Sequence, residues 1–281
     1  MVRDLIYDVG LHKGEDTAYY LALGYRVVAF EANAMLVELC RRRFSKAICN
    51  GRLRIIDGAI DDSGAKTVEF YSHNNTVWGT TDQAWAQRNR WLGESKATPV
   101  RTVDFGACLC ETGMPFYMKV DIEGADRVCF EALRSFDERP VYVSLESEKL
   151  LFPSLLKEFD LLHDLGYDRF AVVQQAGLTN IAEGHHVNGS SIAYRFDRDA
   201  SGPFGPDVGP WVSREAAIAQ YRRIFRQYRL LGDAAVIRSS RVGRVLRARA
   251  ERLLSRPLPG WYDTHATRSA ASLAQTRTTS A

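Results

Sequence analysis

Short apolar runs alternate with helical patterns along most of the chain. The first run, residues 5–9, leads into a glycine-rich turn and a helical pattern at 15–23 that stops at Gly24. A second apolar run at 26–30 ends in Glu31 and is followed by a helical pattern at 34–44. This order predicts a βαβ unit, whose two strands are parallel.

The alternation continues to about residue 196. Apolar runs predict strands at 53–57, 68–72, 116–121, 141–146, 169–174 and 191–196, and helical spacing predicts helices near 81–91, 124–136 and 153–165. Strands that alternate with helices favour an α/β fold, a Rossmann-like sheet that is mostly parallel and carries helices on both faces.

The C-terminal part has a different pattern. Residues 1–198 are predicted as one domain, 199–212 as a Gly/Pro-rich loop, 213–256 as a basic helical appendage with two amphipathic helices, and 257–281 as a disordered tail. Residues 213–256 contain twelve Arg and no Lys against three acids, within a chain of net charge +3. The rest of the chain is therefore acidic on balance. The basic helices either bind a partner of their own or simply expose their arginines to solvent.

Composition narrows the class of protein. With 46% hydrophobic and 25% charged residues, the chain is typical of a globular protein. No apolar run approaches the length of a membrane span, and residues 1–4 do not resemble a secretory signal, so we expect a cytoplasmic protein. Its five cysteines include no C-x-x-C pair and predict neither a disulfide framework nor a metal site.

The first glycine turn carries the candidate binding chemistry. It reads D-x-G-x-x-x-G from Asp8 to Gly14, with Gly10 between them, whereas a diphosphate-binding turn needs G-x-G-x-x-G. A carboxylate at Asp8 repels a diphosphate and suits a cationic sulfonium, which favours S-adenosylmethionine over a nicotinamide dinucleotide. Glu31 is placed to accept hydrogen bonds from both ribose hydroxyls. An ordinary turn without a ligand is the alternative.

A further turn follows the third predicted strand. Asp57 and Ala59 flank a glycine there, and its backbone groups are candidates for contact with an adenine edge. A plain strand exit explains the same residues equally well. His12, inside the first turn, is a further candidate cofactor-binding residue, with a solvent-exposed loop histidine as the alternative.

Three segments together resemble a known family. They read YDVGLHKGEDT at 7–17, VAFEAN at 28–33 and FYMKVDIEGA at 116–125. These segments are similar to the motifs of the FkbM-type methyltransferases, class I S-adenosylmethionine-dependent enzymes of which many methylate hydroxyls of sugars and natural products. The resemblance covers about residues 5–196. It implies that Asp8, Gly10, Gly14 and Glu31 bind the cofactor, that Asp121 lies beside the transferred methyl group, and that a strand near the end of the sheet is antiparallel.

The candidate catalytic residues are Asp121, Glu146 and His185. Asp121 and Glu146 end two predicted strands, where carboxylates could take a proton, hold sugar hydroxyls or bind a divalent cation. His185, in a His-His pair before the strand at 191–196, is a candidate general base. The alternatives are a helix N-cap for Asp121 and a solvated strand end for Glu146.

These observations favour an O-methyltransferase acting on a sugar, a glycolipid precursor or a secondary metabolite, with a small molecule or glycan as acceptor. One alternative is an RNA-binding or RNA-modifying enzyme that uses the Arg-rich helices, although the acidic sheet domain disfavours a nucleic acid. Another is an enzyme held at a membrane surface by residues 236–254, acting on a lipid-linked glycan. Homo-oligomerisation is an open question at this stage.

Overall fold

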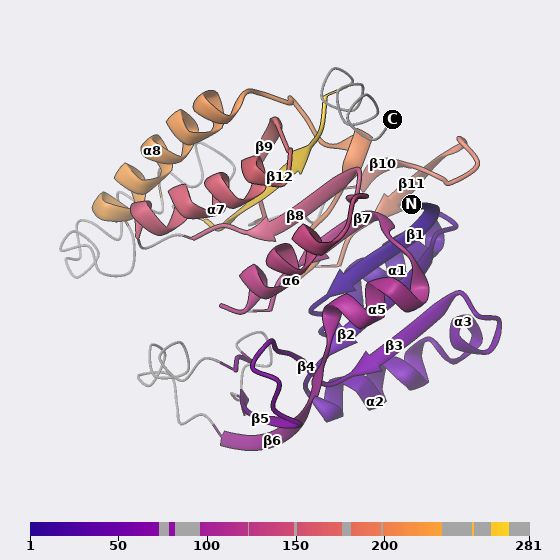
Figure 1. Ribbon diagram of the computed structural model, residues 1–281. Helices are drawn as coiled ribbons and strands as arrows, with labels where there is room; N and C mark the ends of the chain where they lie inside the picture. Colours follow the sequence, from indigo (N-terminus) through magenta and orange to yellow (C-terminus); the bar gives the residue numbers. More distant parts are fainter. Residues whose placement is uncertain are drawn as a thin grey trace. The chain divides into compact units, whose positions relative to one another are not determined.

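The computed structural model describes residues 1–72, 79–81, 96–122, 124–148, 151–175, 181–197, 199–231, 249 and 260–269 (Figure 1). The chain forms two compact units. Unit 1 consists of Met1–Val143 and Ala182–Tyr194, and unit 2 of Ser144–Ile181 and Arg195–Ala281. This division does not coincide with the expected domain boundary at residue 198. The helices predicted near 81–91 and 236–254 lie outside the described residues.

A parallel sheet forms the centre of unit 1. Its strands β1 (Val2–Val9), β2 (Arg26–Glu31), β3 (Leu53–Asp57) and β7 (Pro115–Val120) lie in the order β3-β2-β1-β7, and all three neighbouring pairs are parallel. Their carboxyl ends therefore meet at one edge, where Glu31 pairs in register with Asp57 and Asp8 with Lys119. This confirms the prediction of a mostly parallel, Rossmann-like sheet.

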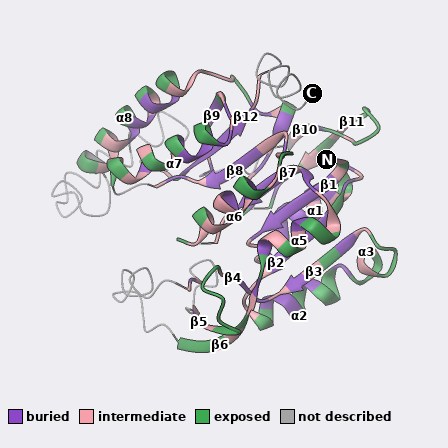
Figure 2. Cartoon of the chain, in the orientation of Figure 1, coloured by how far each residue is buried: buried purple, intermediate pink, exposed green. Residues whose placement is uncertain are grey.

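Helices cover this sheet because each carries one apolar side. Helix α1 (Glu15–Ala22) packs against β1 and β2, and α2 (Ala34–Arg43) against β2 and β3. The side chain of Asn33 caps α2 by accepting a hydrogen bond from the Met35 N–H at 3.0 Å. Unit 1 also contains the helices α3 (Ser45–Cys49), α5 (Phe105–Thr112), α6 (Asp126–Ala132) and the short η3 (Leu133–Ser135). The strands are largely buried (Figure 2).

Two smaller sheets consist wholly or largely of residues of unit 1. Strands β4 (Ala59–Ile60), β5 (Thr67–Ser72) and β6 (Lys96–Val103) form one of them. The hydrophobic pattern does not predict β6, because it is mostly exposed and lacks an apolar run. Strands β10 (Ile181–His185) and β11 (Ser191–Arg195) form the other. The strand predicted at 191–196 therefore pairs in a separate two-stranded sheet.

In unit 2 the antiparallel strand comes from an unexpected part of the chain. Strand β12 (Tyr262–Thr267) pairs antiparallel with β9 (Arg169–Gln174), and all six of its residues are buried. The prediction of a disordered tail is therefore wrong for residues 262–267. The strand reads YDTHAT, which lacks an apolar run, but Asp263 and Thr264 find hydrogen-bond partners inside the fold. Gln175 Nε2, for example, donates to Asp263 Oδ2 at 2.7 Å.

The basic helix α8 (Arg214–Leu231) is an integral part of unit 2 and not an appendage. Its Tyr221 is fully buried, and the hydroxyl contacts Thr264 Oγ1 at 2.8 Å and the Ser147 hydroxyl. The other elements of this unit are β8 (Tyr142–Glu146), which spans the boundary between the units, α7 (Phe152–Asp164) and η4 (Gly205–Asp207). No helix within the described ranges combines the length and apolar character needed to cross a membrane.

The imidazole ring of His265, on β12, is buried away from water. Its side chain is 1% exposed, and within the described part of the chain neither ring nitrogen has a hydrogen-bond partner. Burial lowers the pKa of His265 to about 4, because the charged imidazolium is disfavoured away from water. The unfolded chain thus binds a proton at a higher pH than the folded one. Its contribution to stability is present above pH 6.5 and is lost as the pH falls towards 4.

We expect the substitution His265→Leu to flatten the acid limb of the stability curve. Between pH 7.5 and 5 the native protein should lose about 2 kcal/mol more than the variant, the effect of one proton bound mainly by the unfolded state. Urea unfolding at the two pH values measures this difference. His163→Leu, at an exposed position on α7, serves as the control and should follow the native curve. Parallel curves for His265→Leu and the native protein would contradict the prediction.

Candidate functional site

The turn between β1 and α1 has a left-handed backbone at three positions, and at two of them there is no room for a side chain. Gly10, His12 and Gly14 all adopt positive φ angles, of 94°, 51° and 79°. A Cβ atom on Gly10 would lie 2.0 Å from the backbone oxygen of Asp121, and one on Gly14 would strike the Phe44 ring. Both glycines are thus needed for contacts within the protein, in addition to any room they leave for a ligand.

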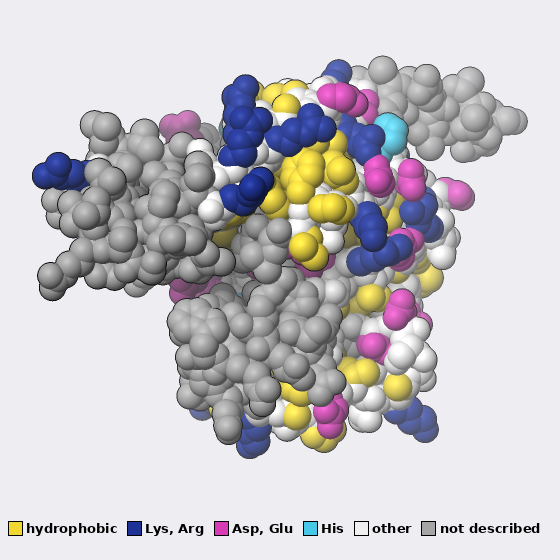
Figure 3. All heavy atoms as spheres, turned by 90° about the vertical axis from the view of Figure 1, so that its left-hand side faces the viewer, with side chains coloured by type: hydrophobic (Ala, Val, Ile, Leu, Met, Phe, Trp, Pro, Cys, Tyr) yellow, Lys and Arg dark blue, Asp and Glu magenta, His cyan; other side chains and the backbone are white. Residues whose placement is uncertain are grey.

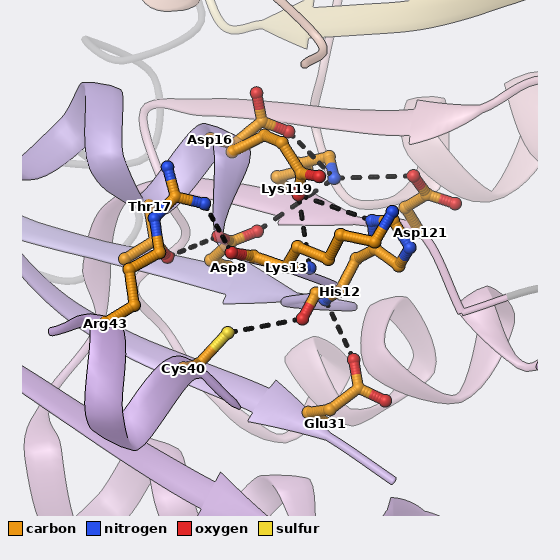
Figure 4. A network of polar contacts seen from close by, with 11 residues as sticks. Asp8, His12, Lys13, Asp16, Thr17, Glu31, Cys40, Arg43, Lys119 and Asp121 are labelled. Atoms are coloured by element: carbon orange, nitrogen blue, oxygen red, sulfur yellow. Dashed lines mark hydrogen bonds and ion pairs between the residues drawn. The ribbon is translucent and has the colours of Figure 1, made fainter. Parts of the chain in front are cut away.

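Helix α2 and the start of α1 hold this turn in place (Figure 4). Cys40 donates its S–H to the His12 carbonyl at 3.3 Å, and Arg43 Nη1 donates to the Lys13 carbonyl at 2.6 Å. The carboxylate of Glu15 accepts the Lys13 N–H at 3.2 Å and lies 3.3 Å from His12 Nδ1. Both sides of the turn are therefore fixed by side chains, which leaves its conformation preorganised.

Glu31, at the end of β2, is held by two backbone donors. Its Oε2 accepts the His12 N–H and its Oε1 accepts the Asn33 N–H, both at 2.8 Å. Burial raises the pKa of Glu31, and the two N–H donors oppose that increase. Each oxygen accepts one of these bonds and keeps a second lone pair. The carboxylate can thus accept two further hydrogen bonds while it stays fixed, as its predicted role requires.

A buried cation joins three carboxylates beside the turn. Lys119 Nζ on β7 lies 3.1 Å from Asp16 Oδ2, 3.4 Å from Asp121 Oδ2 and 4.0 Å from Asp8 Oδ1. The side chains of Lys119, Asp8 and Asp16 are at most 6% exposed, whereas that of Asp121 is 40% exposed. We call these four residues the Lys119 cluster. Three acids outnumber one cation, so the cluster attracts a positive ligand.

The structure buries Asp8 beneath the turn. Thr17 Oγ1 donates to its Oδ2 at 2.5 Å, and within the described residues Oδ1 has no hydrogen-bond partner. Burial raises the pKa of Asp8, and the nearby Lys119 opposes that increase. A direct contact between Asp8 and a cationic ligand, as the sequence suggested, does not fit a side chain this buried. The exposed carboxylate of the cluster is that of Asp121.

Asp121 does not cap the helix that follows it. Helix α6 begins at Asp126, whose own carboxylate accepts the Ile122 N–H at 3.0 Å and the Gly124 N–H at 3.3 Å. The side chain of Asp121 faces Lys119 instead. The helix-cap alternative for Asp121 is therefore wrong, and its carboxylate is available at the carboxyl edge of the sheet.

Asp57 and Ala59 lie next to Glu31, and their predicted contact with the adenine stays a prediction. The Gly58 N–H between them donates to the Glu31 carbonyl at 2.9 Å. Asp57 Oδ2 is 3.6 Å from Arg41 Nη2, and Ala59 is buried in β4. The segment is therefore more than a strand exit, because it continues into a second sheet along the edge that carries Glu31.

His185 lies away from the glycine turn. The loop that follows it is fixed at the far end of α1, where the Val187 N–H donates to the Leu23 carbonyl and the His186 ring lies against Gly24. The turn precedes the first residue of α1, and a helix of this length spans about 12 Å. These contacts place the loop after His185 at the opposite end of α1 from the glycine turn, and the role of His185 as the general base stays a prediction. Glu146 belongs to unit 2, and its role stays a prediction.

Sequence reasoning missed the two residues that hold the cluster together, Lys119 and Asp16. A usable signal was present, because Lys119 interrupts an apolar run in the middle of a strand. A lysine that such a pattern buries needs an acidic partner nearby. Asp16 gave a weaker signal, since an acid in the first turn of a helix is ordinary.

The family model described as the methyltransferase FkbM domain matches residues 8–169, more than half of the chain. The chain belongs to this family. It is thus an S-adenosylmethionine-dependent methyltransferase of the FkbM family, and the matched region contains the glycine turn, Glu31 and the whole Lys119 cluster. No curated protein matches the chain.

Three solved structures share a remote similarity. The methyltransferase FkbM from Methylobacillus flagellatus is 14% identical, with 69% of this chain and 44% of that chain covered and a TM-score of 0.36. The precorrin-6y C5,15-methyltransferase from Geobacter metallireducens is 13% identical, with 69% and 77% covered and a TM-score of 0.35. The TehB-like SAM-dependent methyltransferase from Corynebacterium glutamicum is 9% identical, with 61% and 70% covered and a TM-score of 0.33. At this level of similarity none of the three supports a choice of substrate.

The described residues include no group of three or more His, Cys, Asp or Glu side chains arranged to hold a metal ion. The Lys119 cluster brings three carboxylates together, but the ammonium group of Lys119 lies among them. A divalent cation there would have to displace or oppose that charge.

We expect Lys119→Met to cost about 3–5 kcal/mol of unfolding free energy, because it leaves buried carboxylates without their cation. Arg54→Met is the matched control. It breaks an ion pair with Glu111 whose side chains are 50% and 58% exposed, and should cost less than about 1 kcal/mol. Urea unfolding at pH 7 measures both. Equal losses in the two variants would show that the cluster is not a buried electrostatic unit.

Proposed function

We propose that this enzyme transfers the methyl group of S-adenosylmethionine to a hydroxyl on a sugar, a glycolipid precursor or a secondary metabolite. The observation that carries the proposal is the Asp121 carboxylate. It is the exposed member of an anionic cluster, at the carboxyl edge of a parallel sheet beside a preorganised glycine turn. Ligands of open α/β sheets bind at this edge.

The charge of the site supports a sulfonium ligand. Lys119 is already engaged with three acids, so a diphosphate would meet excess negative charge beside the turn. A positively charged sulfonium would be attracted instead. Glu31 adds the second requirement, two remaining acceptor sites on a fixed carboxylate, which suit the vicinal hydroxyls of a ribose. Asp57 and Ala59, next to it in space, remain candidates for the adenine end.

The cofactor supplies an electrophilic methyl group with a neutral thioether as leaving group. The protein must then orient the acceptor hydroxyl and take its proton as the new bond forms. Asp121 can do both, since one oxygen is held near Lys119 and 40% of the side chain is exposed. The ion pair with Lys119 holds the carboxylate of Asp121. The backbone of Asp121 is held as well, because its N–H donates to the Val9 carbonyl at 2.9 Å.

Glu31→Ala should weaken the binding of S-adenosylhomocysteine at least tenfold. The substitution removes the acceptor of two hydrogen bonds, each worth about 1.5–3 kcal/mol when the acceptor is charged. Glu38→Ala is the control, because Glu38 lies on α2 with a side chain 55% exposed and pairs only with Arg41 among the ion pairs described. Titration calorimetry on the three proteins measures the affinities. An unchanged affinity in Glu31→Ala would remove Glu31 from the cofactor site.

Asp121→Asn should slow methyl transfer by about 10² to 10⁴ while it leaves the affinity for S-adenosylhomocysteine within about threefold, because the amide cannot take the proton. Transfer from methyl-labelled S-adenosylmethionine to a panel of sugars and glycolipids provides the rate. Asp104→Asn is the control. Its carboxylate caps α5 by accepting the Ala107 N–H, a role that asparagine fills equally well. Normal turnover in Asp121→Asn would exclude it as the base.

A further inference from the structure

The exposed side of α8 is rich in arginine. Arg222, Arg223, Arg226 and Arg229 are all exposed, and the helix has one acid, Glu215, in its first turn. Within the part of the chain that the structure describes, none of these four arginines forms an ion pair. Four cations within two turns repel one another in water, so this face favours an anionic surface.

The orientation of α8 is fixed by its opposite face. Ala217, Tyr221 and Ile224 are buried, and the Tyr221 hydroxyl contacts Thr264 at 2.8 Å. The four arginines fall on the opposite side of the helix from these buried residues, because consecutive side chains are rotated by about 100°. The arginines are therefore presented to the surface by the packing of unit 2.

Aromatic side chains border the arginines. The ring centroids of Phe152 and Phe225 are 5.1 Å apart, and those of Phe225 and Tyr228 are 6.0 Å apart. The guanidinium of Arg222 lies 6.0 Å from the centroid of Phe152. The aromatic row thus runs from the start of α7 across to α8, and the guanidinium of one arginine lies over its first ring.

Two strongly exposed apolar side chains extend this row. Leu151, directly before α7, is 59% exposed, and Trp261 is 44% exposed. Trp261 follows Gly260, whose carbonyl accepts the Tyr228 hydroxyl at 2.9 Å, so it lies beside the C-terminal half of α8. We call Leu151, Phe152, Phe225, Tyr228 and Trp261, together with the four arginines, the α8 surface. The face turned towards the viewer in Figure 3 shows hydrophobic side chains gathered among Lys and Arg.

We propose that the α8 surface docks on a lipid bilayer that contains anionic headgroups. Arginines that bind lipid phosphates, next to a tryptophan and an aliphatic side chain that enter the headgroup region, are typical of interfacial helices. RNA would also attract the arginines and could stack on the aromatic rings, but it gains nothing from Leu151. The lipid surface uses both the charge and the apolar residues, and this inference does not depend on the acceptor proposed above.

Co-sedimentation of the full chain with vesicles tests the proposal. At low salt, vesicles with 30% phosphatidylserine should bind the protein at least tenfold more tightly than pure phosphatidylcholine vesicles, since several arginines near such a surface each add to the affinity. The variant Arg222→Gln, Arg226→Gln, Arg229→Gln should lose at least tenfold. A control with the same change in charge, Arg3→Gln, Arg42→Gln, Arg127→Gln, alters exposed arginines of unit 1 and should bind as the native protein does.

Leu151→Asn separates lipid from RNA. It should weaken binding to the anionic vesicles about threefold or more and leave the retention of a single-stranded RNA 20-mer unchanged. Thermal unfolding of each variant within about 2 °C of the native value shows that the fold is kept. Equal binding to neutral and anionic vesicles, no loss in the α8 triple variant, or tighter binding of RNA than of anionic vesicles would each overturn the proposal.

Discussion

The buried ammonium group of Lys119 holds the site together. Its three carboxylate neighbours come from the end of β1, the first turn of α1 and the end of β7, so one cation joins three elements at one edge of the sheet. A buried lysine is costly unless it is paired, and here the pairing fixes Asp121. The cluster has three carboxylates and one ammonium group. The same ion pairs that stabilise this edge of the sheet therefore also favour a positively charged ligand there.

Beside the Lys119 cluster, contacts with the rest of unit 1 fix the backbone of the glycine turn. Gly10 passes against the Asp121 backbone, and α2 holds the turn carbonyls through Cys40 and Arg43. The turn in its turn fixes the carboxylate of Glu31, because the backbone N–H of His12 donates to it. Charge and hydrogen-bond acceptors are therefore placed before any ligand arrives, which reduces the entropy that binding must offset.

The sequence predicted the parts of this fold in which the local pattern and the tertiary role agree. The strands at 5–9 and 26–30 are buried at almost every position and read as apolar runs, whereas the strand at 53–57 is buried only in part, with Arg54 exposed. The pattern failed for β12, because its residues are buried inside the fold although most of them are polar and no apolar run marks the strand. A lysine within the buried run of β7 did signal a paired cation, but its acidic partners come from distant elements, and the local pattern does not identify them.

A crystal structure of the complex with S-adenosylhomocysteine tests the central claim most directly. The account predicts both ribose hydroxyls on the Glu31 carboxylate, the thioether sulfur on the side of Asp121, and the His12 N–H still donated to Glu31. Asp8 should remain buried against Lys119. A ligand bound elsewhere, or one that contacts Asp8 and leaves Glu31 free of the ribose, would contradict it.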